Sequence, residues 1–271
     1  LPVPEVVAVS DDRMVYLQTD LGDTLLFQAI EKGRLTRSFS AEERELLSRT
    51  IRMLPDLQFN GAVGLDFSKC YPLPQFDTRT VLWDLNYFKY CFLKATGLEF
   101  QEDRLEDDFQ AMAEVLMRSM SSTFMYRDFQ SRNVMLRDGN PYFIDFQGGR
   151  KGPYFYDVAS FLWQAKANFP DSLRHELIKE YIDSLRRYVP VDETYFMEQL
   201  RHFVLFRTLQ VLGAYGFRGY FEKKPHFMQS VPFAVANLRE LLHEPFHEYP
   251  YLTQVLKDLC ELKQFSSEGT K

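Results

Sequence analysis

The sequence predicts a mainly helical α+β protein in which one short β-hairpin is embedded in a helical body. Three observations support this fold class. The chain has 271 residues, of which 45 % are hydrophobic and 15 % aromatic, and this is enough apolar material for a packed core. Apolar residues recur at helical spacing through most of the chain after residue 23. Between Phe124 and Asp145, short apolar runs alternate with polar ones, which is typical of strands and turns.

The N-terminal residues predict two short strands. Residues 6–9 and 14–18 are rich in valine and other strand-forming residues, and Asp11 and Asp12 provide a turn between them. Leu21, Gly22 and Asp23 interrupt this pattern, so we expect the strand region to end there.

Helices are expected over most of the chain after residue 23. Ser40 and Glu43 form a capping-box pattern that opens a helix reaching about residue 57, and Asp77 is placed to cap a second helix over 78–95. An acidic first turn, which suits the positive end of a helix dipole, predicts a third helix over 102–120. Further helices are expected over 157–167, 173–188, 192–215, 231–243 and 251–263, and the polar tail at 266–271 is expected to fray.

The embedded hairpin is predicted from residues 134–136 and 142–144, which flank an Asp138–Gly139 turn. Asn133 precedes the first strand and Asp145 comes after the second. Because both residues sit at the open end of paired strands, we expect them to lie close together.

The residues around this hairpin include three polar side chains at a characteristic spacing. Asp128 and Asn133 form an R-D-x-x-x-x-N pattern, and Asp145 begins a D-F-Q sequence at a strand end. Phosphoryl transfer from ATP uses one carboxylate to accept or orient the proton of the acceptor hydroxyl, and oxygen ligands to hold Mg²⁺ on the phosphates. The alternative is an Asx-rich loop that satisfies its own backbone, but the spacing and the flanking strands favour the kinase pattern.

These motifs resemble those of protein-kinase-like phosphotransferases, in particular the aminoglycoside phosphotransferase and choline kinase group. The resemblance implies that Asp128 is the catalytic base, that Asn133 and Asp145 are the Mg²⁺ ligands, and that the cofactor is ATP. Arg132 would lie near the transferred phosphate and offset its charge; the alternative is an ordinary surface arginine. Asp157 closes a G-P-x-x-x-D motif, and the resemblance gives it the structural task of bracing the catalytic loop.

The similarity extends to both sides of the catalytic loop. Residues 16–23 resemble the hinge between the two lobes of the family, where backbone groups of Thr19, Asp20 and Leu21 would bond the adenine edge. Together with residues 207–213, the motifs look most similar to bacterial kinases that phosphorylate the anomeric hydroxyl of N-acetylmuramate and N-acetylglucosamine. The implied partner is therefore a small-molecule acceptor, a sugar or amino sugar.

The sequence departs from the family pattern at its N-terminal end. The family has a glycine-rich loop and a lysine on a strand, whereas the lysines before Asp128 (Lys32, Lys69, Lys89 and Lys94) fall in expected helices or loops. The resemblance implies that residues 1–23 are a remnant of the nucleotide-binding lobe and that residues 24–271 are the helical C-terminal catalytic lobe. On this interpretation the chain is a truncated kinase, and whether it is active alone stays open.

Two further features of the sequence concern histidine positions. Tyr126 stands where the group usually has His, a position that mainly anchors packing and backbone. His243 and His247 match the H-E-x-x-H pattern of zinc proteases. That pattern needs both histidines on one helix, and Pro245 disfavours a helix there, so we expect the preceding helix to end near His243.

Composition and charge narrow the classes of partner and the cellular setting that we expect. With 32 basic and 38 acidic residues the net charge is −6, which argues against binding nucleic acid through bulk charge. Cys70, Cys91 and Cys260 lack metal-site spacing and favour reduced thiols, and no uncharged stretch reaches about 18 residues. We therefore expect a cytoplasmic kinase with no membrane or nucleic-acid partner. An aminoglycoside, choline or homoserine-type acceptor and a non-catalytic nucleotide-binding regulatory module remain the alternatives, and the oligomeric state stays open.

Overall fold

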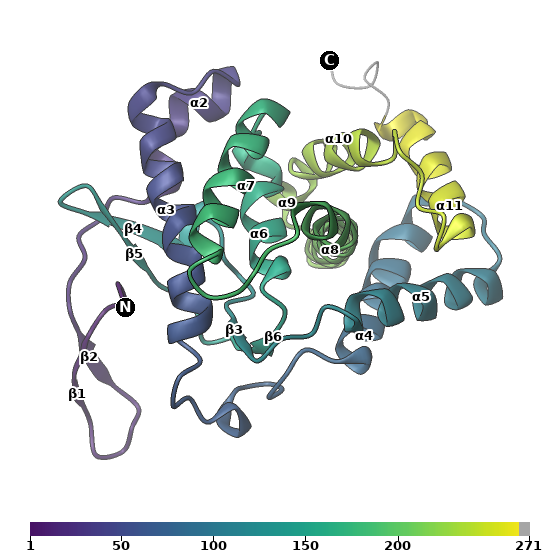
Figure 1. Ribbon diagram of the computed structural model, residues 1–271. Coiled ribbons are helices and arrows are strands. Elements are labelled where there is room, and N and C mark those ends of the chain that lie inside the picture. The colour runs from purple at the N-terminus through teal and green to yellow at the C-terminus, as the bar shows by residue number, and fades with distance from the viewer. Residues whose placement is uncertain (266–271) are drawn as a thin grey trace. The chain divides into compact units, whose positions relative to one another are not determined.

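The computed structural model describes residues 1–265 (Figure 1), so the tail expected to fray at 266–271 lies outside the described part. The chain divides into two compact units. Unit 1 contains residues 1–75, 122–162 and 167–193, and unit 2 contains residues 76–121, 163–166 and those from 194 onward. The functional boundary expected after residue 23 stays a prediction.

Unit 1 contains three pairs of antiparallel strands. They are β1 (Val6–Val9) with β2 (Tyr16–Gln18), β4 (Val134–Arg137) with β5 (Asn140–Phe143), and β3 (Thr123–Met125) with β6 (Arg150–Gly152). The first two pairs confirm the expected hairpins. The third was not expected, because each strand has three residues and its partner is distant in sequence. The Thr123 hydroxyl donates to the Gly152 carbonyl across it, at 2.6 Å.

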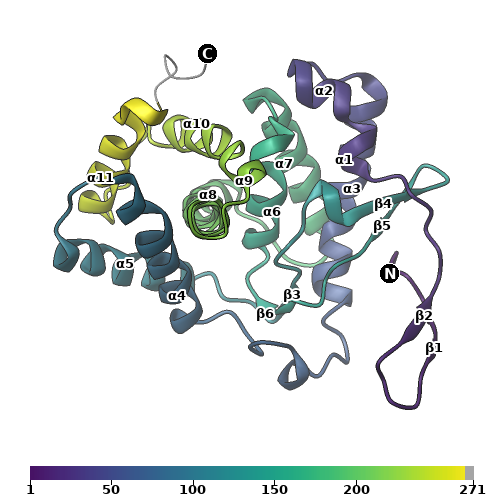
Figure 2. The same ribbon diagram turned by 180° about the vertical axis from the view of Figure 1, so that it is seen from behind.

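The helices of unit 1 include one long helix, α3. They are α1 (Leu26–Ala29), α2 (Glu31–Thr36), α3 (Ala41–Asn60), α6 (Phe155–Leu162) and α7 (Asp171–Leu185). The α3 and α7 helices lie side by side in both views (Figures 1 and 2). Ser40 and Glu43 form the expected capping box, in which each residue's side chain accepts a hydrogen bond from the other's backbone N–H, at 3.2 and 2.8 Å. The helix expected over 157–167 instead begins at Phe155 and ends at Leu162.

Unit 2 is helical. Its helices are α4 (Thr78–Phe88), α5 (Glu102–Met117), α8 (Glu193–Gly216, with Glu193 in unit 1), α9 (Pro225–Met228), α10 (Val231–Leu241) and α11 (Pro250–Glu261). Asp77 caps α4 as expected, since its carboxylate accepts from the Thr80 N–H at 2.8 Å. None of the helices within residues 1–265 is both long and apolar enough to cross a membrane.

The helix expected over 78–95 is not α-helical throughout. It ends at Phe88 and continues as a π-helical turn, Lys89–Leu93, and a 3₁₀ turn, Lys94–Thr96. Gly216 of α8 packs against this π turn so closely that a Cβ there would lie 2.2 Å from the Cys91 carbonyl oxygen. The widened turn accompanies a close backbone approach between segments far apart in sequence, which helical periodicity does not reveal.

Candidate active site

The β4–β5 hairpin of unit 1 brings Asn133 and Asp145 together. Val134 pairs with Phe143, and beyond this pair the Ile144 N–H donates to the Asn133 carbonyl at 3.1 Å. Asn133 therefore lies opposite Ile144, the neighbour of Asp145, at the open end of the hairpin, as the sequence predicts. The Asp145 side chain is exposed and accepts a hydrogen bond from the Gln147 amide at 2.9 Å.

The loop between β3 and β4 carries Asp128, which is half-buried. The Asn133 side-chain amide donates to the Asp128 backbone carbonyl at 2.7 Å and so closes the loop on itself. That bond uses the amide nitrogen, which leaves the Asn133 amide oxygen as the atom available to a ligand. A carboxylate and an amide oxygen at one end of a hairpin form the type of donor set that suits Mg²⁺.

Asp157, the first-turn acid of α6, holds this loop from below the surface. It is completely buried, and its carboxylate accepts hydrogen bonds from the backbone N–H groups of Tyr126 and Arg127, at 2.9 and 2.8 Å. Burial raises the pKa of Asp157 to about 6, while these hydrogen bonds oppose the shift. Because the two N–H groups immediately precede Asp128, Asp157 fixes the backbone that presents the Asp128 side chain.

Gln58 of α3 completes this support, and the sequence analysis missed it. Its amide nitrogen donates to the Asp157 carboxylate and to the Tyr154 carbonyl, both at 3.0 Å. Its amide oxygen accepts from the Tyr181 hydroxyl of α7 at 2.7 Å. A signal was present, because Gln58 follows Ile51 and Leu54 on the apolar stripe of α3, where a glutamine needs buried partners.

Tyr126, the residue in place of the usual histidine, is also buried. Its hydroxyl forms a hydrogen bond with the Ile144 carbonyl, and burial raises the pKa of the phenol. The tyrosine therefore provides an anchoring contact between the loop that carries Asp128 and the residue that precedes Asp145.

Arg132 is exposed, and its guanidinium lies 4.5 Å from the centre of the Phe27 ring. Arg34 lies 3.5 Å from the centre of the same ring, and its Nε donates to the Phe27 carbonyl at 2.9 Å. The Phe27 ring of α1 thus positions two guanidinium groups, of which the sequence analysis named only Arg132. A contact of Arg132 with phosphate stays a prediction.

The hinge candidates lie between β2 and α1. The Thr19 N–H donates to the Glu5 carbonyl at 2.9 Å, the Asp20 carboxylate accepts from the Gly22 N–H at 2.8 Å, and Leu21 is buried. Three residues later, the Thr24 carbonyl accepts from the Leu136 N–H of β4 at 2.8 Å. The segment after the hinge candidates is therefore joined to the hairpin that carries the proposed metal ligands.

The H-E-x-x-H segment does not form a helix. The α10 helix ends at Leu241, and residues 242–249 are turns and irregular backbone. The expected end of this helix near His243 is confirmed, and His243 and His247 do not share a helical face.

A braced loop that carries Asp128 and is followed by a β-hairpin, set in a mainly helical chain, is the arrangement of a protein-kinase-like phosphotransferase. The chain belongs to the phosphotransferase enzyme family (APH), whose family model matches residues 1–191. The expected family and fold class are thereby confirmed.

Similar proteins support the same class. An N-acetylmuramate/N-acetylglucosamine kinase of Neisseria meningitidis is 27 % identical over 248 residues, which cover 88 % of this chain and 70 % of that protein. A kinase of the same name from Pseudomonas aeruginosa is 24 % identical over 237 residues, 85 % of this chain and 65 % of the relative. The crystal structure of choline kinase LicA from Streptococcus pneumoniae shares the fold, with a TM-score of 0.55 and 12 % identity over 88 % of this chain and 75 % of that one.

Proposed function

We propose that this phosphotransferase transfers the γ-phosphoryl group of ATP to the anomeric hydroxyl of N-acetylmuramate or N-acetylglucosamine. The observation that carries the proposal is the arrangement of Asp128, Asn133 and Asp145 around one closed loop and one hairpin end. The curated relatives named for these two sugars support the choice of acceptor.

In this proposal the Asp128 carboxylate orients the acceptor hydroxyl and accepts its proton. The Asn133 amide oxygen and the Asp145 carboxylate would hold Mg²⁺, which when bound neutralises charge on the phosphates. Arg132 offsets charge on the transferred group from its place on the Phe27 ring. Backbone groups of Thr19, Asp20 and Leu21 bind the adenine edge.

The test is a phosphate-transfer screen of the complete gene product with ATP and Mg²⁺. N-acetylmuramate, N-acetylglucosamine, choline and kanamycin are supplied separately, and the phosphorylated product is identified by mass spectrometry. We expect turnover with one or both acetylated sugars and at least about tenfold lower kcat/KM with the other two. Preference for choline or kanamycin would overturn the acceptor. Binding of ATP without transfer to any acceptor would favour a non-catalytic nucleotide-binding module.

Two accompanying predictions concern the setting of the enzyme. We expect a cytoplasmic location, to be checked by cell fractionation, and no binding to nucleic acid, to be checked by gel shift at low salt. Binding of either duplex or single-stranded nucleic acid at micromolar protein would contradict the second prediction.

A further inference from the structure

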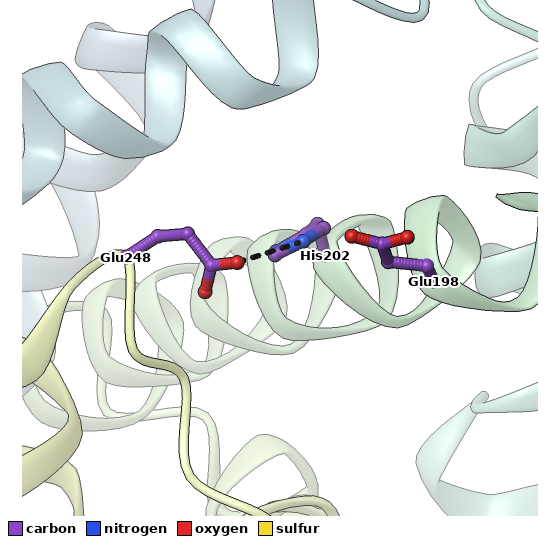
Figure 3. Close-up of side chains that lie close together, drawn as sticks. All are labelled: Glu198, His202 and Glu248. Atoms are coloured by element: carbon purple, nitrogen blue, oxygen red, sulfur yellow. Dashed lines mark ion pairs between the residues drawn. The ribbon is translucent and has the colours of Figure 1, made fainter.

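Unit 2 contains a cluster of possible metal ligands that the proposed phosphoryl transfer does not use. Glu198 and His202 are one turn apart on α8, and Glu248 belongs to the segment between α10 and α11. One ligand atom from each of the three lies within 4.8 Å of the others. Figure 3 shows the His202 ring between the Glu198 and Glu248 carboxylates, with a dashed line marking the ion pair between His202 and Glu248.

The His202 ring is the fixed part of this cluster. It is only 3 % exposed, and its Nδ1 shares a hydrogen bond with the Tyr249 hydroxyl. Burial lowers the pKa of His202, which favours a neutral imidazole near pH 7. In the tautomer whose Nδ1–H donates to Tyr249, the Nε2 lone pair faces Glu248, and metal-binding histidines are commonly held by such a bond to their second nitrogen.

The distance between His202 and Glu248 is informative. His202 Nε2 lies 4.0 Å from Glu248 Oε1, which is too long for a hydrogen bond. Two ligands on one tetrahedral Zn²⁺ ion, each with a bond of about 2.1 Å, are separated by about 3.4 Å, so binding would draw these two atoms together by roughly half an ångström. The three ligand atoms lie within 4.8 Å of one another, so the exposed Glu198 and Glu248 side chains would close on the ion by up to about 1.5 Å.

The charges around the cluster leave a place for a cation. Within residues 1–265, the Glu198 carboxylate forms neither a hydrogen bond nor an ion pair. The positive side chains that act on His202 are Arg118 and Arg201. Arg201 is engaged elsewhere, because its guanidinium pairs with Glu244 at 3.5 Å and stacks on Phe246 at 3.9 Å.

We propose that Glu198, His202 and Glu248 bind one Zn²⁺ ion, which fastens the segment between α10 and α11 to α8. The imidazole nitrogen selects a cation of the zinc type over Mg²⁺, which prefers ligands that are all oxygen. The site is therefore distinct in chemistry from the Asn133 and Asp145 pair proposed for phosphoryl transfer. Two glutamates and one histidine leave a fourth coordination position for water.

The experiment titrates the chelator-treated protein with ZnCl₂ against a fluorescent zinc indicator. Nucleotide is left out, and about 5 mM Mg²⁺ is present in large excess so that only a site that prefers zinc is detected. We expect one Zn²⁺ per chain and a rise in Tm on binding. Glu198→Gln and Glu248→Gln should each weaken binding about tenfold or more and remove the rise in Tm. Both residues are exposed, so these variants should fold, which circular dichroism checks.

The matched control is His175→Gln, which removes an exposed histidine whose Nδ1 lies 3.3 Å from the Asp171 carboxylate one turn away. This variant should bind zinc as the parent does. Absence of micromolar zinc binding by the parent would overturn the proposal. Equal binding by the Glu198→Gln/Glu248→Gln double variant would also overturn it and assign the metal to other groups, such as the free thiols.

Discussion

Asp157 combines two properties that usually exclude one another, because it is a carboxylate and it is completely buried. Three N–H donors compensate its charge, from Tyr126, Arg127 and Gln58. A buried carboxylate costs several kcal/mol unless it is fully hydrogen-bonded. Two of these donors are the backbone N–H groups that immediately precede Asp128. The buried carboxylate therefore holds the backbone that presents the Asp128 side chain.

The raised pKa of Asp157 predicts a specific pH dependence of stability. Its pKa of about 6 exceeds the value of roughly 3.9 for an unfolded Asp, so the folded protein binds this proton more tightly. The stabilisation, about 3 kcal/mol, is complete below about pH 4 and is lost as the pH rises to 6. Asp157→Asn has no titrating group at this position. Urea unfolding should therefore show the free energy of unfolding of the parent falling relative to that of Asp157→Asn, by about 3 kcal/mol between pH 4 and pH 6. Parallel pH curves would contradict this interpretation.

Replacement of the proposed base tests the chemistry directly. Asp128→Asn keeps the side-chain volume and removes the proton acceptor, so we expect kcat to fall about 10²- to 10⁴-fold with little change in Tm. Steady-state kinetics with the preferred sugar measure the effect. The control is Asp138→Asn in the hairpin turn, where the backbone has φ +51°, a conformation that asparagine tolerates. Normal turnover by Asp128→Asn would exclude its role as base.

At the scale of single elements, the capping box of α3 is the clearest stabilising device. Ser40→Ala removes an acceptor for the Glu43 N–H and should lower the free energy of unfolding by about 1 kcal/mol. The control is Ser38→Ala two residues earlier, because the exposed Ser38 side chain makes no hydrogen bond among the described residues. Urea denaturation measures both variants, and equal effects would assign the loss to something other than the cap.

Elements that depend on local signals could be predicted from the sequence. Ser40 and Asp77 cap their helices, and the Asp138–Gly139 turn closes its hairpin with positive φ at both positions. The β3–β6 pair and the π turn at Lys89–Leu93 could not be predicted from the sequence, because each depends on a contact between segments that are distant in sequence. No local pattern indicates that Gly216 will approach the Cys91 carbonyl.

The same distinction applies to the candidate site. Asp128, Asn133 and Asp145 lie within 18 residues and are recognised by spacing, and the hairpin register brings the last two together. Gln58 joins the site through its contact with Asp157, and Phe27 through its contact with Arg132. Asp157 is 99 residues from Gln58 and Arg132 is also far from Phe27 in sequence, so spacing does not identify these contacts.

At the scale of the molecule, neither compact unit is one continuous stretch of chain, because each is assembled from three segments. Residues 1–191 match the family model, but they omit all of α8, α9, α10 and α11. Within unit 2, α5 packs on α11, and α4 approaches α8 closely at Gly213. The C-terminal helices are therefore part of the same core as α4 and α5.

A truncated protein tests whether α4 and α5 depend on the C-terminal helices for a stable core. In a protein ending at residue 191, we expect buried apolar residues of α4 and α5, including Leu85, Phe88 and Phe109, to become exposed. We expect it to bind a hydrophobic dye strongly and to lose at least part of its cooperative thermal unfolding. Calorimetry of the truncated and complete chains measures the difference, and a truncated protein with the parent's Tm and cooperativity would contradict the prediction.

The geometry of the β4–β5 hairpin limits the insertions and deletions that a functional protein could tolerate there. Both proposed metal ligands flank the open end of the ladder, and the Asp138–Gly139 turn closes the other end. Residues added at the turn would lengthen an exposed tip and leave Asn133 opposite Ile144. Loss of one residue inside either strand would reverse the face of every side chain beyond it and separate the ligands. We therefore expect length variation among functional relatives to be confined to the turn.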